Sequence, residues 1–129
     1  MTSIDLSIQL CNIKLRNPTI LASGILGTTK ALLKRVAESG AGAVTIKSVS
    51  REPREGHKNP TVITFEGGML NAVGYSNPGV DAAAREFSSL HEVDAPVIAS
   101  VIGTQKEDFA RVVHGLSEAK FSAIEIPLS

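Results

Sequence analysis

Residues 45–79 read TIKSVSREPREGHKNPTVITFEGGMLNAVGYSNPG, and the rest of the chain is organised around this stretch. It begins inside an apolar run that starts at Ala43, and Lys47 stands directly at the end of that run. About thirty residues punctuated by Gly and Pro follow before helical periodicity resumes, and a connection of that length is usually functional or disordered. The apolar side chains between Val62 and Tyr75 argue against disorder, because they provide enough surface to fold back on the molecule. We therefore expect a binding loop over the carboxyl end of a strand.

Apolar segments of strand length recur on both sides of this stretch. Residues 4–10 and 13–15 alternate apolar and polar side chains, which predicts a half-buried hairpin. The remaining apolar runs are continuous, as expected for strands that are covered on both faces. These predicted strands occupy residues 19–22, 43–47, 97–101 and, as the start of a fourth, 122–126.

Helical patterns separate the predicted strands. Thr28 or Thr29 can cap the first helix, and Gly40 ends it in the left-handed conformation that glycine adopts readily. Asn77 is the predicted N-cap of the second helix, and a capping box over residues 104–107 starts the third. Apolar strands that alternate with amphipathic helices imply an α/β fold, with a parallel sheet covered by helices. Two architectures compete, an open doubly wound sheet and a (β/α)8 TIM barrel, which normally needs about 250 residues.

The composition restricts the classes of function. A chain of 129 residues normally makes one domain, and its 13 basic and 13 acidic residues balance. That balance argues against nucleic acid or an anionic membrane as the main partner. No apolar run approaches the roughly 20 residues of a membrane span, and the histidines lack the spacing of a metal site. A single cysteine, Cys11, fits a reducing compartment, so we expect a cytoplasmic protein.

Small and polar residues stand where two predicted strands end. Ala22, Ser23 and Gly24 either let a flat ligand or a phosphate approach the backbone, or form a tight turn. Lys47 and Ser48 follow the next strand. A lysine that emerges from a buried strand must pair, reach solvent or meet an anionic ligand.

Two asparagines, Asn71 and Asn77, bracket Gly74 in the second half of the stretch. Asparagine side chains can read both donors and acceptors on a planar, imide-like substrate. Asparagine is also common in turns, and helix capping is a sufficient role for Asn77.

Taken together, these segments resemble the N-terminal half of dihydroorotate dehydrogenase, the flavin enzyme of pyrimidine and UMP biosynthesis. They occur in the order and with the spacing of that family, and the resemblance covers the whole chain. It is greatest to the cytosolic class 1 enzymes of the type that pairs with an iron–sulfur flavoprotein subunit. The matching runs are Asn17-Pro18, Ala22–Gly24, Thr45–Ser48, Glu52–Gly56, Met69–Gly74 and Asn77–Gly79.

The resemblance implies a fold and an activity. Residues 1–129 would form the N-terminal half of a single FMN-binding TIM barrel domain, as a hairpin and about four βα units. The enzyme would oxidise dihydroorotate to orotate, with a proton leaving C5 and a hydride passing from C6 to the flavin. Dimers or larger assemblies are implied, while the electron acceptor is chosen outside this region. Two other functions stay open: a flavin barrel acting on another reduced pyrimidine, and a non-catalytic half-barrel module.

The resemblance also assigns residues. Ala22, Ser23 and Gly24 would line the FMN, and Lys47 with Ser48 would contact the edge of its ring. A cation at this edge stabilises the anionic reduced ring that hydride uptake creates. The residues that would bind the substrate are Lys47, Asn71, Val73, Gly74 and Tyr75.

The last residues depart from the family's pattern. There the fourth strand runs into Asn-x-Ser-Cys-Pro, in which the asparagine binds the ligand and the cysteine is the base. Pro127 stands at the asparagine's position, so that contact is lost or moved. Ser129 matches the serine before the base, so no catalytic base is expected within the chain. Residues 1–129 alone are not expected to be active, and we expect a longer enzyme rather than a true half-barrel.

Overall fold

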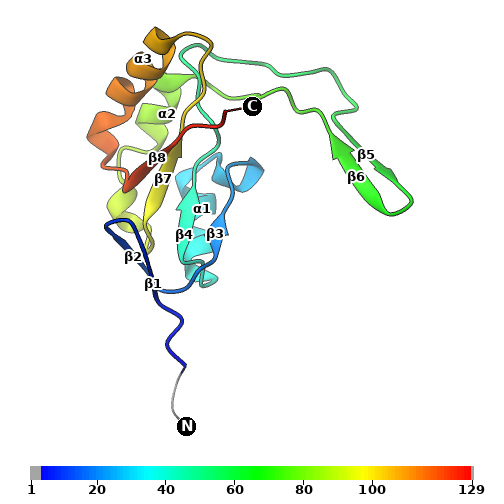
Figure 1. Cartoon of the computed structure of the whole chain (residues 1–129). Coiled ribbons are helices and arrows are strands. Elements are labelled where there is room, and N and C mark those ends of the chain that lie inside the picture. Colours follow the sequence, from blue (N-terminus) through cyan, green and yellow to red (C-terminus); the bar gives the residue numbers. More distant parts are fainter. Residues whose placement is uncertain (1–3, 129) are drawn as a thin grey trace.

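The computed structural model describes residues 4–128, and its centre is a four-stranded parallel sheet (Figure 1). The strands lie in the order β3–β4–β7–β8, which is also their order along the chain. A doubly wound sheet reverses its strand order at a switch point, and no reversal occurs within the described residues. The predicted parallel sheet of an α/β fold is confirmed. The strands are β3 Ile20–Leu21, β4 Ala43–Thr45, β7 Val97–Ser100 and β8 Ala123–Glu125.

Three α-helices pack on one face of this sheet (Figure 1). Successive side chains of a strand point to opposite faces, so neighbouring residues join different clusters. Val44 and Ala99 belong to the core under the helices, whereas Ala43 and Ile98 belong to a smaller cluster on the other face. The helices are α1 Lys30–Glu38, α2 Val80–Glu86 and α3 Lys106–Leu116. Single 3-10 turns follow β3, α2 and α3, at η1 Ile25–Gly27, η2 Leu90–Glu92 and η3 Ser117–Ala119.

An antiparallel hairpin covers part of the other face. It consists of β1 Ile8–Leu10 and β2 Ile13–Leu15, so the predicted hairpin is confirmed. Leu15 is 1% exposed and packs in one cluster with Ala43 and Ile98. The expected half-burial of the first strand is wrong, because only β2 contributes side chains to that cluster and β1 is exposed.

The outer strands of the sheet are less buried than their composition predicts. Ile20 in β3 is 40% exposed and Ile124 in β8 is 49% exposed. Among the described residues β3 and β8 each pair with one neighbouring strand, whereas β4 and β7 pair on both sides. The prediction of full burial for residues 19–22 is therefore wrong, since an edge strand has one side without a partner.

The long stretch contains an antiparallel hairpin where the sequence predicts an irregular loop. β5 Val62–Phe65 pairs with β6 Gly68–Asn71 across the two residues Glu66 and Gly67. Gly67 has φ +87°, and two-residue hairpin turns favour a positive φ. The glycine at this turn was the signal in the sequence that could have predicted the hairpin.

This hairpin extends away from the sheet, as Figure 1 shows. We call residues 55–76 the arm, because two backbone hydrogen bonds of 2.9 Å between Arg54 and Asn77 close its base. The expectation that its apolar side chains fold back on the molecule is wrong for six residues that are all exposed. They are Val62, Ile63, Phe65, Met69, Leu70 and Val73.

The first helix starts and ends as the sequence predicts, but the second does not. The Thr29 hydroxyl accepts a 3.3 Å hydrogen bond from the N–H of Leu32, and Gly40 follows α1 with φ +100°. The prediction that Asn77 caps the second helix is wrong, because α2 begins after Gly79. Asn77 lies instead two residues before the N-cap, Gly79, and its amide oxygen accepts a 3.0 Å hydrogen bond from the Gly79 N–H.

The third helix begins one residue later than predicted. Its N-cap is Gln105, and the carboxylate that closes the capping box belongs to Asp108. Asp108 accepts hydrogen bonds of 3.2 Å from the N–H groups of Thr104 and Gln105. Both bonds lower the pKa of Asp108 below its usual value of 3.8, and the bond from Thr104 has the larger effect.

Replacing Asp108 with alanine is expected to lower the thermal midpoint near neutral pH, because two N–H groups lose their acceptor. Since the folded pKa is lowered, the carboxylate's contribution is complete above about pH 4 and is lost as pH falls through the folded pKa. The difference in midpoint between wild type and Asp108→Ala should therefore shrink towards about pH 2. Glu107→Ala is the control, because the Glu107 carboxylate has only an exposed 3.7 Å ion pair with Lys106. A difference that is independent of pH would contradict this role.

Candidate functional site

The carboxyl ends of parallel strands meet at one edge of the sheet, and the residues after β3 and β4 meet there. The N–H of Lys47, beyond β4, donates a 2.8 Å hydrogen bond to the carbonyl of Gly27, beyond β3. Ser48 and Ser100 are buried, and their hydroxyl oxygens lie 2.9 Å apart. The structure therefore joins Lys47 and Ser48 to the connection after β3 and to the end of β7.

The continuation of β4 departs from regular pairing at these residues. Thr45 pairs with Ile98 within the sheet, and Val49 pairs with Val101 in an isolated bridge. Three residues of the β4 segment thus oppose two of the β7 segment, which defines a β-bulge. The bulge lies at Lys47 and Ser48, and bulges characteristically redirect side chains next to active sites.

Lys47 is partly buried and lines a cavity of about 220 Å³. The ammonium group of Lys47 enters none of the ion pairs formed within residues 4–128. A positive charge that is left unpaired at this edge suits an anionic or strongly polarised ligand. Other lining residues are Thr28 before α1, Ser76 at the end of the arm, Asn77 at its base, Glu86 in α2 and Phe87 directly after it.

The segment Ala22–Gly24 lies at the same edge, beyond β3. Gly24 has φ 172°, which is extended backbone that any residue can adopt. Its conformation therefore does not require a glycine. A Cβ at Gly24 would meet only the carbonyl oxygen of Ala22, at 4.0 Å. The backbone here is open on the side where a side chain would stand, so a flat ligand has room to approach.

The remaining predicted site residues belong to the arm. Asn71 ends β6 and is exposed, and Figure 1 shows that β6 extends away from the sheet. The structure therefore does not place Asn71 beside Lys47. Gly74 and Tyr75 have φ +73° and +56°, so the chain turns sharply where it returns to the body. Val73 lies at this turn, and its carbonyl accepts a 3.1 Å hydrogen bond from the N–H of His57.

Asn77 holds the base of the arm through its buried amide. Its oxygen accepts hydrogen bonds from the N–H groups of Ser50 (3.1 Å) and Gly79 (3.0 Å). Its NH₂ group donates to the Ser50 hydroxyl (2.9 Å) and to the carbonyl of Tyr75 (2.8 Å). One side chain thus ties the exit of β4 to the return of the arm.

Asn77→Ala is expected to lower the free energy of unfolding by about 2 kcal/mol, because buried N–H and C=O groups lose their partners. Asn71→Ala is the matched control, since its amide is exposed, and a change within about 0.5 kcal/mol is expected. Urea unfolding of both variants measures the effect, and faster hydrogen exchange at Ser50 and Gly79 would localise it. Equal stability of the two variants would contradict the role of Asn77.

Sequence reasoning missed Ser100 as a member of the site. Ser100 is 0% exposed, and its hydroxyl meets that of Ser48, which was singled out. The available signal was a hydroxyl inside an otherwise apolar strand, since a buried hydroxyl requires a partner. Pro127 follows β8 and is half-buried, whereas Ser129 lies outside the described residues.

Among residues 4–128, no group of three or more His, Cys, Asp or Glu side chains is arranged to hold a metal ion. None of the helices there has the length and hydropathy needed to cross a membrane.

The fold is that of an α/β protein, and the candidate site lies where successive parallel strands end. The model of the dihydroorotate dehydrogenase family matches residues 5–129. The chain therefore belongs to the dihydroorotate dehydrogenase family, which confirms the resemblance found in the sequence.

Three relatives carry the name dihydroorotate dehydrogenase B (NAD(+)), catalytic subunit. The protein of Methanocaldococcus jannaschii is 44% identical over 128 residues, covering 96% of this chain and 42% of the relative. The protein of Methanosarcina mazei is 49% identical over 122 residues, or 93% and 39% of the two chains. The protein of Pyrococcus furiosus is 42% identical over 126 residues, covering 98% of this chain and 41% of the relative. The chain thus spans about two fifths of the length of the relatives it matches.

Proposed function

We propose that this chain is the N-terminal part of an FMN-dependent dihydroorotate dehydrogenase of pyrimidine biosynthesis. The family match over residues 5–129 carries the proposal, together with relatives that are named as its catalytic subunit. Residues 1–129 would form the N-terminal half of one (β/α)8 barrel domain. The order β3–β4–β7–β8 supports this, because consecutive strands of a barrel are neighbours.

The residues at the sheet edge fit a flavin. The open backbone at Gly24 would admit a flat ring beside Ala22 and Ser23. Lys47 and Ser48 would meet the polar edge of the ring, and the hydrogen bond between the two hydroxyl groups of Ser48 and Ser100 holds the Ser48 side chain in place. When bound, FMN supplies the hydride acceptor of the reaction.

The oxidation removes a proton from C5 and a hydride from C6 of dihydroorotate, and a C5–C6 double bond forms. The ammonium group of Lys47 would stabilise the negative charge that develops at the polar edge of the site. The Asn71 amide would donate and accept hydrogen bonds with the substrate's imide, and the turn Val73–Tyr75 would supply backbone groups. For Asn71 to meet the same substrate as Lys47, the arm has to bend towards the sheet at its base. We place no catalytic base within residues 4–128.

The partners form part of the same proposal. The relatives are named as catalytic subunits, which implies a further subunit, and we propose an iron–sulfur flavoprotein in that role. A homo-oligomer in the cytoplasm fits a biosynthetic enzyme of this family. The formal net charge of zero gives no electrostatic reason for a nucleic-acid partner.

The visible absorption spectrum of the full-length purified protein, before and after anaerobic addition of dihydroorotate, tests the proposal. We expect a flavin band that bleaches when the substrate is added. A flavin band that persists would contradict the substrate and favour a flavin barrel acting on another reduced pyrimidine. A colourless protein that cannot be reconstituted with FMN would overturn the proposal and favour a non-catalytic half-barrel module.

A further inference from the structure

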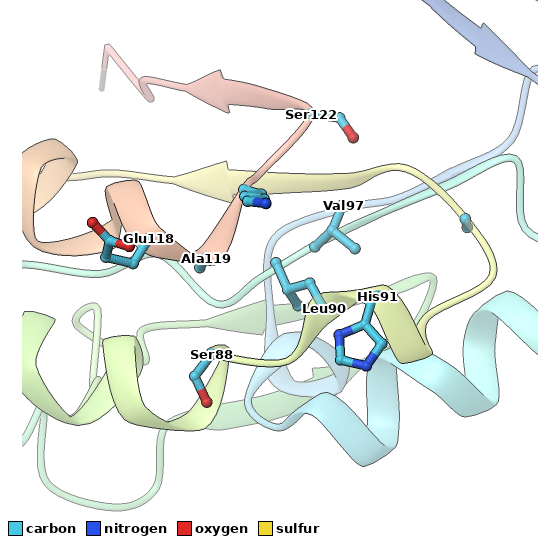
Figure 2. Close-up of a pocket in the computed structure, with 9 residues that line it drawn as sticks. Ser88, Leu90, His91, Val97, Glu118, Ala119 and Ser122 are labelled. Carbon is cyan, nitrogen blue, oxygen red and sulfur yellow. The ribbon is translucent and has the colours of Figure 1, made fainter.

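Two features of the molecule lie outside the proposed flavin site. The first is a cavity of about 490 Å³ that is lined by residues of η2, η3 and the amino end of β7 (Figure 2). Leu90 and Val97 form its apolar floor, and Figure 2 shows that Glu118 points away from this floor. The charged side chains at its rim are exposed, so the cavity gives no indication of a ligand. The second feature is the contact of His57 with the returning side of the arm.

His57 holds two successive carbonyl groups of the segment that follows β6. Its backbone N–H donates a 3.1 Å hydrogen bond to the Val73 carbonyl. Its ring nitrogen Nδ1 lies 3.0 Å from the Ala72 carbonyl oxygen. Because a carbonyl oxygen can only accept, Nδ1 carries the proton and donates this bond. One residue on the outgoing side of the arm thus engages Ala72 and Val73 on its returning side.

The close approach of His57 depends on the glycine that comes next, Gly74. A Cβ at Gly74 would lie 2.9 Å from the backbone nitrogen of His57 and 3.0 Å from Cγ of its ring. Gly74 also has φ +73°, a conformation that residues with a side chain rarely adopt. The imidazole ring therefore lies against bare backbone, in space that a side chain at position 74 would fill.

These contacts fix the direction of two peptide units. A trans peptide unit is planar, and its N–H points opposite to its C=O. Holding the Ala72 carbonyl therefore directs the N–H of Val73, and holding the Val73 carbonyl directs the N–H of Gly74. Both N–H groups point away from their carbonyl contacts with His57, and neither donates to another main-chain group within residues 4–128.

We propose that His57 is a positioning residue for the substrate. It orders the turn Val73–Tyr75 before the substrate arrives, so that the N–H groups of Val73 and Gly74 are already directed towards an acceptor. A turn that is ordered in advance loses less conformational freedom on binding, which strengthens binding. The inference rests on the proposed function, in which this turn supplies backbone groups to dihydroorotate.

Two variants separate the hydrogen bond of His57 from the bulk of its ring. His57→Phe keeps a ring beside Gly74 but has no donor for the Ala72 carbonyl. His57→Asn has its amide nitrogen one bond from Cγ, as Nδ1 is in histidine, so it can restore the bond. Lys58→Ala is the control, because Lys58 is the next residue, is exposed and enters none of the ion pairs within residues 4–128.

Hydrogen exchange of the full-length protein without substrate, followed by mass spectrometry, measures the order of residues 70–76. We expect exchange about three- to tenfold faster in His57→Phe, because the segment loses one of its hydrogen bonds. Exchange in His57→Asn and Lys58→Ala should be close to that of the wild type. Unchanged exchange in His57→Phe would overturn the proposal, and this result does not depend on dehydrogenase activity.

Anaerobic flavin reduction at varied dihydroorotate concentration tests the effect on the substrate. His57→Phe should raise the dissociation constant of dihydroorotate about tenfold. Its limiting rate should stay within about twofold of the wild type, because backbone contacts away from the C5–C6 bond bind substrate and transition state alike. His57→Asn should restore the dissociation constant, and Lys58→Ala should leave it unchanged.

The outcomes separate this inference from the proposed function. If the wild-type flavin is reduced and His57→Phe keeps the wild-type dissociation constant, the role of His57 is structural only and the proposal is overturned. A wild-type flavin that dihydroorotate does not reduce would overturn the proposed function instead. Hydrogen exchange would then still decide whether His57 orders the turn.

Discussion

Replacing Gly27 with alanine is expected to lower the free energy of unfolding by about 3 kcal/mol. A Cβ at Gly27 would lie 2.5 Å from the Thr45 carbonyl oxygen and 2.6 Å from the Lys47 nitrogen. Both neighbours are main-chain atoms of the β4 segment, so a side-chain rotation cannot relieve the overlap. Separating the two segments would also stretch the 2.8 Å hydrogen bond from the Lys47 N–H to the Gly27 carbonyl. Urea unfolding measures the loss of stability.

Gly24→Ala is the control for this prediction. Gly24 lies three residues earlier in the same connection, but its Cβ would meet only the Ala22 carbonyl oxygen, at 4.0 Å. Its backbone is extended, with φ 172°, so alanine adds no strain and a change within about 0.5 kcal/mol is expected. Equal stability of Gly27→Ala and wild type would show that η1 does not pack on the end of β4 as described.

Lys47→Ala in the full-length enzyme is expected to lower the rate of flavin reduction by dihydroorotate about a hundred- to a thousandfold. The variant removes an ammonium group that no carboxylate neutralises within residues 4–128, at the edge where negative charge would develop. The backbone N–H of Lys47 remains, so its hydrogen bond to Gly27 and the fold should be kept. Anaerobic stopped-flow absorption measures the rate, and the intensity of the flavin band measures cofactor content.

Lys34→Ala is the matched lysine control, because Lys34 is exposed on α1 and does not line the cavity beside Lys47. Its flavin content and reduction rate should equal those of the wild type. If Lys47→Ala also kept full flavin content and an unchanged rate, Lys47 would not belong to the site. If Lys47→Ala lost flavin but kept the wild-type free energy of unfolding, Lys47 would contribute to cofactor binding.

Features that depend on nearby residues could be predicted from the sequence. The cap at Thr29 and the left-handed Gly40 follow from local hydrogen bonds and glycine's conformational freedom, and both predictions are confirmed. The start of α2 could not be predicted in this way. Asn77 is a good capping residue by type, but its amide is engaged by Ser50 and Tyr75, which lie on segments that only the fold brings together.

The residues of the candidate site also fall into those that the nearby sequence predicts and those that only the fold reveals. Lys47 and Ser48 stood out because polar residues end an apolar run. Ser100 did not, because its role depends on the register between β4 and β7, which places its hydroxyl 2.9 Å from that of Ser48. The arm shows the opposite error: its apolar residues were expected to pack on the molecule, yet strand pairing within the arm leaves them exposed.

The sequence by itself determined the alternation of strands and helices, the polar and small residues after the first two strands of the sheet, and membership of the dihydroorotate dehydrogenase family. These properties follow from the order of residues along the chain, because hydrophobic periodicity and short motifs can be recognised without knowing which distant residues come into contact. Only the tertiary structure decided which strands lie at the edge, how Asn77 holds the arm, and that the hydroxyl groups of Ser48 and Ser100 meet. Each of these depends on contacts between residues far apart in the chain, and burial and pairing energies exist only once those contacts form.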